Sequence, residues 1–198
     1  MRKAGLLSLA VIVFFVSGIQ AQAVHLGLKA GVNLAQITGR SFNGGFQTGF
    51  SGGAFAELKI NSKWDVQPEV LYAQTQVTTS NEFYYTSNPQ FDGIPNRTIS
   101  LNYINVPILI SYKLIPVLSI QAGPSFGFLM STSENIMTNN QDAFKTTDFS
   151  VVGGAQVNLS RVKLGARYSY GLTDISKVTP TDTWKNQNIQ VYIGFLLF

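Results

Sequence analysis

The sequence predicts an all-β protein, an eight-stranded antiparallel up-and-down transmembrane β-barrel. Three observations predict it: eight segments alternate between apolar and polar residues, short turns and long polar loops alternate between them, and only 12% of the residues are charged. Successive side chains of a strand point to opposite faces, so a period of two indicates one apolar and one polar face. The segments are residues 24–34, 46–60, 64–76, 98–113, 118–130, 148–159, 161–172 and 187–198.

The first 23 residues have the pattern of a cleaved signal peptide. Arg2 and Lys3 form a charged start, an apolar stretch runs from Leu6 to Val16, and a small-x-small cleavage site ends at Ala23. The apolar stretch is too short for a spanning helix, which needs about 20 residues. We therefore expect a signal peptide over 1–23 and a single barrel domain over 24–198.

Composition excludes several classes of function. The chain has 14 Lys and Arg against 10 Asp and Glu, a balance of +4, and without Arg2 and Lys3 the balance becomes 12 against 10, or +2. This small surplus, with no basic cluster, argues against nucleic acid as a partner. Cysteine is absent, so disulfides, thiolate metal sites and thiol nucleophiles are excluded.

The first three segments carry their apolar residues at even positions. In 24–34 every even residue is apolar, from Val24 to Leu34, while the odd residues are polar, small or His. Residues 46–60 and 64–76 follow the same rule over most of their length. Their even-numbered apolar residues are Phe46, Phe50, Ala54, Ala56, Leu58, Ile60, Trp64, Val66, Val70 and Tyr72.

The later segments keep the alternation. The apolar side is even in 98–113 and 118–130, odd in 148–159, and even again in 161–172. The last segment, 187–198, is apolar on both sides in its second half, so its facing stays open. In 161–172 the apolar side is Val162, Leu164, Ala166, Tyr168, Tyr170 and Leu172, against Arg161, Lys163, Gly165, Arg167, Ser169 and Gly171.

Connections of two kinds join the segments. Tight turns are predicted at 61–63, at 114–116 and around Ser160. The long connections are rich in Asn, Ser, Thr and Asp, which is typical of loops. Alternating short and long connections indicate an up-and-down meander. The long loops are residues 36–45, 78–97, 132–146 and 173–186.

Two barrels fit this meander, a soluble lipocalin-like one with an apolar interior and a membrane barrel with an apolar exterior. The charged fraction of 12% is about half the share usual in soluble domains. The polar side is rich in Gly, which weakens a solvated strand but suits a crowded lumen. These features favour the membrane barrel, with outer-membrane lipid against its apolar face.

Charged residues on the polar side should therefore fill the lumen, because a lipid-facing Arg or Lys costs about 2–4 kcal/mol at mid-bilayer. We expect Arg161 to point inward too, and Glu57 and Glu69 to pair with Lys29 and Arg167. No continuous water path should remain, since eight strands leave room only for side chains. The predicted lumen charge network is Lys29, Glu57, Lys59, Glu69, Lys163 and Arg167.

Aromatic residues of the apolar side lie toward the segment ends, as in the aromatic girdles of membrane barrels. Trp64, Tyr112 and Phe198 lie toward the short turns, and the others toward the long loops. A terminal aromatic is common in outer-membrane barrels and is the feature that the barrel-assembly machinery would read. The predicted girdle is Trp64, Tyr72, Tyr112, Tyr168, Tyr170 and Phe198.

Four stretches carry a family resemblance: GLKAGVNLAQITG (27–39), YINVPILISYKL (103–114), AGPSFGFL (122–129) and ARYSYGLTDIS (166–176). Together with the terminal Phe198, they resemble the porin-like outer-membrane β-barrel family of Bacteroidetes, which includes PorT-type proteins. The resemblance implies an integral protein of the cell outer membrane without a common catalytic activity. Members often carry an acidic residue two positions before the proline of the fourth strand, where this chain has Asn105 before Pro107.

Catalytic and metal sites are not predicted. His25, the only His, has no Ser and Asp partners that would build a catalytic triad. Asp174 and Asp182 share a loop, but calcium needs several oxygen ligands at organised spacing. We expect no cofactor and a structural role, or an interaction with a protein partner at the loops or periplasmic turns. The alternatives are a narrow channel or transporter for small solutes and a lipocalin-like binding barrel.

Overall fold

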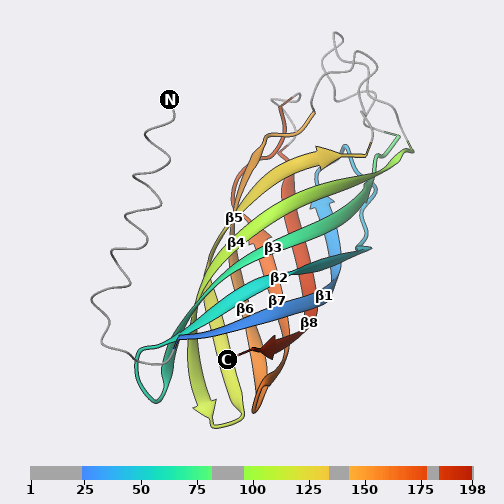
Figure 1. The fold of residues 1–198 in the computed structure, drawn as a ribbon. Helices are drawn as coiled ribbons and strands as arrows, with labels where there is room; N and C mark the ends of the chain where they lie inside the picture. Colours follow the sequence, from blue (N-terminus) through green and yellow to red (C-terminus); the bar gives the residue numbers. More distant parts are fainter. Residues whose placement is uncertain (1–23, 82–95, 134–142, 178–182, 198) are drawn as a thin grey trace, which may run out of the picture.

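The structure, a computed structural model, describes residues 24–81, 96–133, 143–177 and 183–197, and it is a closed barrel of eight antiparallel strands in chain order (Figure 1). The signal peptide expected over 1–23, together with Asp182 and Phe198, lies outside the described residues. The strands are β1 (Val24–Thr38), β2 (Gln47–Lys59), β3 (Trp64–Thr78), β4 (Thr98–Ile115), β5 (Leu118–Thr132), β6 (Thr147–Leu159), β7 (Val162–Gly171) and β8 (Lys185–Leu196).

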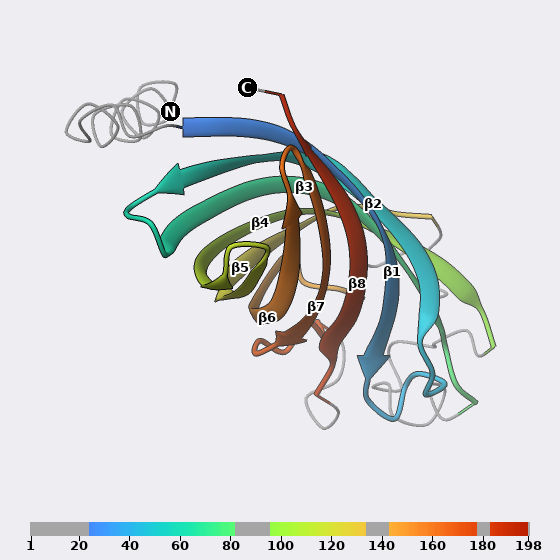
Figure 2. The same cartoon turned by 90° about the horizontal axis from the view of Figure 1, so that it is seen from below.

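The barrel closes between its first and last strands. β1 pairs antiparallel with β8 from Gly27 opposite Leu196 to Thr38 opposite Lys185. Closure satisfies the backbone groups that an edge strand would leave unpaired, as a membrane interior requires. Figure 2 shows β1 and β8 side by side around the wall.

Short turns join the strands at one end, which we call the short-turn end. The side chain of Asn61 stabilises the β2–β3 turn by accepting hydrogen bonds from the backbone N–H groups of Lys63 and Trp64, both at 2.9 Å. Ser160 makes the tight β6–β7 turn with a φ of 56°. The strand ends that the other connections join lie at the opposite, long-loop end (Figure 1).

The wall has an apolar outer face, as the alternation predicts. Leu28, Val70, Ile110 and Val191 are all more than half exposed on it. β8, whose facing the sequence left open, follows the same rule: Val191, Ile193 and Phe195 face outward, and Gln190, Tyr192 and Leu196 are buried inside.

Candidate functional site

The barrel interior is the candidate site, and it divides into three zones along the barrel. The vestibule lies at the short-turn end, the charge layer lies above it, and the apolar cap closes the long-loop end. Their residues come from the inward-facing side of the strands, and in the cap also from the long connections.

The vestibule is an open cavity of about 480 Å³. Its position is fixed by Pro116, Ser160 and Arg161, which lie in two of the short turns. Cations outnumber anions on its wall, which carries Lys59, Lys113, Arg161 and Lys163 but only one acidic residue, Glu57. The full lining is His25, Glu57, Lys59, Lys113, Pro116, Asn158, Ser160, Arg161, Lys163 and Leu196.

Two ion pairs are built into this zone. Lys163 Nζ lies 3.0 Å from Glu57 Oε1 and donates to Asn158 Oδ1 at 3.0 Å. Lys113 Nζ lies 3.2 Å from Asp65 Oδ2. Both pairs border an open cavity, so water reduces the cost of holding them there.

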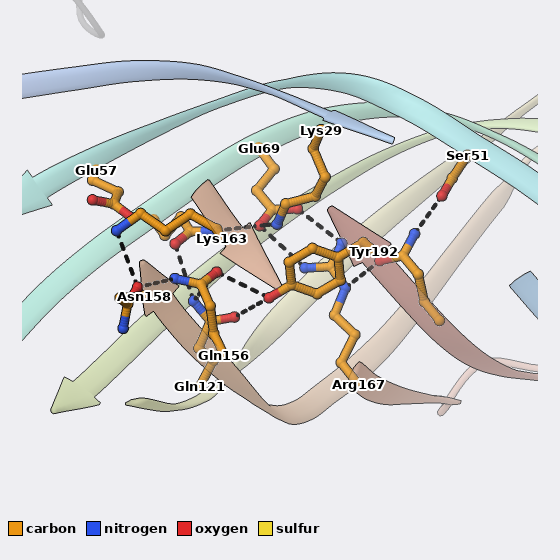
Figure 3. A network of polar contacts seen from close by, with 12 residues as sticks. Lys29, Ser51, Glu57, Glu69, Gln121, Gln156, Asn158, Lys163, Arg167 and Tyr192 are labelled. Atoms are coloured by element: carbon orange, nitrogen blue, oxygen red, sulfur yellow. Dashed lines mark hydrogen bonds and ion pairs between the residues drawn. The ribbon is translucent and has the colours of Figure 1, made fainter. Parts of the chain in front are cut away.

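Glu69 is the centre of the charge layer, and its side chain is fully buried. Lys29 Nζ lies 2.5 Å from Glu69 Oε1. Arg167 binds both carboxylate oxygens, with Nη1 3.1 Å from Oε1 and Nη2 2.8 Å from Oε2. Gln67 adds a fourth bond, donating to Oε1 at 2.7 Å. Figure 3 shows Lys29 and Arg167 converging on this carboxylate.

The three charges meet because of their places along the strands. Lys29, Glu69 and Arg167 are the sixth residues of β1, β3 and β7, and each of these strands starts at the short-turn end. Equal distances from one end bring them to similar heights inside the barrel. A buried charge needs such partners, and two-bond pairing of a carboxylate suits the planar guanidinium of Arg.

Amide and hydroxyl groups extend the charge layer across the lumen. Arg167 Nε donates to Gln190 Oε1 at 2.5 Å, and Gln190 Nε2 donates to Ser51 Oγ at 2.5 Å and Asn33 Oδ1 at 3.1 Å. On the other side, Tyr192 Oη lies 3.0 Å from Oε1 of both Gln121 and Gln156 (Figure 3). The layer therefore fills the cross-section with bonded side chains.

Two aromatic rings complete the charge layer. Lys29 Nζ lies 4.0 Å from the ring centroid of Tyr192 and 5.2 Å from that of Phe55, which are favourable cation–π distances. Glycines make room for the rings, because a Cβ on Gly165 would collide with the Tyr192 ring and one on Gly27 with the Phe55 ring. The Gly-rich polar side thus accommodates large side chains from neighbouring strands.

The apolar cap is a correction to the expected polar lumen. Near the long-loop end the inward positions of β1, β3 and β4 become apolar, and residues of the long connections cover them. Phe42, Phe144 and Trp184 come from three different connections, and their ring centroids lie 4.8 to 6.2 Å apart. The cap consists of Ile37, Phe42, Val77, Ile99, Leu101, Tyr103, Ala143, Phe144, Ile175 and Trp184.

Backbone bonds hold the connections against the cap. Phe42 forms a β-bridge with Thr79, and Phe144 forms one with Ser176. Asp174 Oδ1 accepts from the N–H groups of Ser176 at 3.0 Å and Trp184 at 2.9 Å. Asp174, weighed above as a calcium ligand, thus organises its own loop.

The structure places the predicted network residues in two groups. It brings Lys29, Glu69 and Arg167 together, but Glu57 pairs with Lys163 rather than with Lys29 or Arg167. The reason is height: Glu57 and Lys163 both lie within three residues of the short-turn ends of their strands. Lys59 lies with them, on the vestibule wall.

Arg161 corrects a second expectation. We expected it to point into the lumen from the seventh strand, but that strand begins at Val162 and Arg161 lies exposed in the β6–β7 turn, at the mouth of the vestibule. A cation there avoids lipid without entering the filled lumen. His25, the other candidate weighed for chemistry, also lines the vestibule.

The aromatic residues of the predicted girdle lie on the outer face where the structure describes them. Trp64 and Tyr112 pack together near the short-turn end, with ring centroids 4.6 Å apart. Tyr72, Tyr168 and Tyr170 are partly exposed higher on the wall.

Sequence reasoning missed the inward Phe55 and Tyr192, and it left the Gln residues of the charge layer out of the predicted network. The sequence does hold a signal for these two rings. The inward positions around each of them on its own or the adjoining strands include glycines, which leave space for a large side chain. Within the ranges that the structure describes, no group of three or more His, Cys, Asp or Glu residues could hold a metal ion. No helix of this part of the chain is long and apolar enough to span a membrane.

An apolar exterior around a closed and filled sheet defines the class: a transmembrane β-barrel of eight strands. The family model described as outer membrane protein beta-barrel domain matches residues 20–177, and the chain belongs to this family. It is an integral protein of the outer membrane, which excludes the lipocalin-like alternative.

Solved structures support the fold. Neisserial surface protein A (NspA), known from a crystal structure, shares 17% sequence identity with this chain. The two structures superpose with a TM-score of 0.56, and the match covers 88% of this chain and 99% of the NspA chain. OprG from Pseudomonas aeruginosa is 11% identical with a TM-score of 0.51, covering 89% and 97%. The comparison with curated proteins found no match.

Proposed function

We propose that this protein is a non-conducting, non-enzymatic outer-membrane barrel that presents its long loops as an interaction surface. The observation that carries the proposal is the pair of obstructions in the lumen, the charge layer around Glu69 and the apolar cap. A through-going solute path would have to break both. The loops, in turn, are held on a packed base rather than on an open rim.

Conductance in planar bilayers tests the closed lumen. We expect the refolded full chain to insert without stable openings, while a large porin conducts in the same membrane. The alternative function, a narrow channel or transporter for small solutes, has one observation in its favour, the open vestibule of about 480 Å³. Stable, ion-selective openings would establish that alternative and refute the filled-lumen proposal.

Crosslinking in intact cells tests the interaction role. A photo-crosslinking residue at Gly44 would report on the long-loop end, where a side chain would meet no neighbouring atom within 4 Å. The matched probe is Lys63, exposed in the β2–β3 turn at the periplasmic end. We expect a specific adduct from Gly44. An adduct from Lys63 alone would move the interaction surface to the periplasmic turns, and no adduct from either would contradict it.

Export and assembly belong to the same proposal. We propose that residues 1–23 are removed as a signal peptide and that the C-terminal strand, ending at Phe198, is read by the barrel-assembly machinery. N-terminal sequencing of the membrane-bound protein should begin at Val24. Deletion of Phe198 should reduce the heat-modifiable, folded fraction in the outer membrane, whereas full assembly would contradict its role as a signal.

Finer family membership is also a proposal. We infer that the chain belongs with the Bacteroidetes porin-like barrels that include PorT-type proteins, on the four stretches quoted above. Its departure at Asn105 fits the interior of this barrel, since Asn105 lines a small cavity that already holds the carboxylate of Asp148. Asn105→Asp introduces the acidic residue of the family pattern. We expect this variant to assemble in the outer membrane as the wild type does, and a loss of assembly would show that this barrel does not accept the family pattern.

A further inference from the structure

A small polar chamber lies between the charge layer and the apolar cap. It has a volume of about 30 Å³, and Tyr103 belongs both to its wall and to the cap. Polar groups from several strands line it, including Tyr103, Asp148, Asn186, Asn188, Thr75 and Ser150. A volume of this size holds an ion or one to two water molecules, not a hydrated solute.

Asp148 is the carboxylate of the chamber, and it is 8% exposed. Thr173 Oγ1 donates to Asp148 Oδ1 at 2.8 Å, and the Asn186 side chain also hydrogen-bonds Asp148. Among the described residues, no Lys or Arg forms an ion pair with it. The other buried carboxylates of the described lumen, Glu57, Asp65 and Glu69, each form an ion pair with a Lys or Arg, so Asp148 differs from them.

Three buried oxygens of the chamber lack a hydrogen-bond partner among the described residues: Tyr103 Oη, Asn186 Oδ1 and Asn188 Oδ1. Tyr103 is only 2% exposed. The orientation of Asn186 follows from its partner, since a carboxylate accepts only and the amide must offer it an N–H group. Its carbonyl oxygen is therefore left as an acceptor, and buried acceptors of this kind need a donor or a cation.

We propose that this chamber is a binding site for a small monovalent cation, with Na⁺ as the ion that fits its chemistry. Asp148 and the three unpartnered atoms all offer oxygens, the ligands that hard cations prefer. A single carboxylate balances a single positive charge, and the shortage of further acids disfavours a divalent ion. A bound cation would neutralise Asp148 and satisfy the two amide oxygens and the tyrosine oxygen together.

Ion-dependent stability is the first test, because an ion that binds only the folded state stabilises it by mass action. The full chain, folded in vesicles, would be unfolded in NaCl or in N-methyl-D-glucamine chloride at equal ionic strength. We expect the unfolding midpoint to rise with Na⁺ concentration. Asp148→Asn should lose this dependence, while Asp174→Asn, a change at a loop carboxylate, should keep it.

Tyr103→Phe gives a second variant that keeps the carboxylate and the shape of the cap. We expect it to fold and to need a several-fold higher Na⁺ concentration for the same shift. Soaking crystals with Tl⁺ supplies a direct readout, with an anomalous peak expected beside Asp148. A wild-type midpoint independent of Na⁺, an unchanged dependence in Asp148→Asn, or no Tl⁺ peak in the chamber would overturn the proposal in favour of a protonated Asp148 with bound water.

Discussion

At the short-turn end the lumen is an open vestibule with cationic side chains around it, whereas at the long-loop end it is closed by packed aromatic and aliphatic residues. The same wall surrounds both ends, with the same apolar outer face. The contents differ because the strands supply the vestibule's charges apart from Arg161, which lies in the β6–β7 turn, whereas the connections supply half of the cap.

This difference shows how one barrel separates two tasks. The charge layer ties β1, β3 and β7 together across the lumen, and so stabilises the barrel as a whole. The cap anchors the long connections, and so stabilises the surface that we propose for interactions. Substitutions in the two regions should therefore differ both in the size of their effects and in how far the effects spread.

The largest loss is expected from Glu69→Ala. It leaves Lys29 and Arg167 buried beside each other without their carboxylate, and removal of one partner of a buried pair costs about 3–5 kcal/mol. Urea unfolding in lipid vesicles would measure the free energy of unfolding. The matched variant is Glu57→Ala, which should lose less, because its partner Lys163 borders the open vestibule. Equal losses would mean that the charge layer is no drier than the vestibule.

The next effect is expected from Ile175→Ala in the apolar cap. Ile175 is fully buried, and truncation of a buried Ile costs about 2–5 kcal/mol through the lost transfer energy and the cavity left behind. The damage should stay at the long-loop end, so limited proteolysis should cut the long connections faster and leave the short turns unchanged. Leu172→Ala, at an exposed position nearby, is the control. Uniform exposure of both ends would refute separate roles for cap and charge layer.

A smaller effect is expected from Gly165→Ala, which tests how tightly the charge layer is packed. The new Cβ would collide with the Tyr192 ring, and overpacking of this kind costs about 1–3 kcal/mol. Gly153→Ala is a matched control on β6, because its Cβ would meet nothing within 4 Å. Identical unfolding curves for the two variants would show that the ring moves aside without cost.

The two regions also differ in how far the sequence predicts them. The strict alternation of β1 and β7 predicts their facing, and the cost of a lipid-facing charge places Lys29 and Arg167 inside. The predicted partner of Glu57 was wrong. Which cation Glu57 meets depends on the relative heights of the side chains along the barrel, and strand tilt and register set these heights. The cap was not predicted, since Ile37 falls in the expected loop 36–45 and Leu101 reads as a break in the alternation until the connections that cover them are placed.

The smallest effect is expected from Asp174→Asn, which changes a charge at the cap without changing its packing. Lys145 Nζ lies 3.6 Å from Asp174 Oδ2, and both side chains are more than a third exposed, so the pair is worth about 0–1 kcal/mol. Asn keeps an oxygen that can accept from the N–H groups of Ser176 and Trp184. Asp174→Ala removes that acceptor and should cost more, because the N–H group of Trp184 then loses its bond beside the cap. Urea unfolding of both variants separates charge from loop anchoring, and an Asn variant as unstable as the Ala variant would show that the ion pair holds the loop.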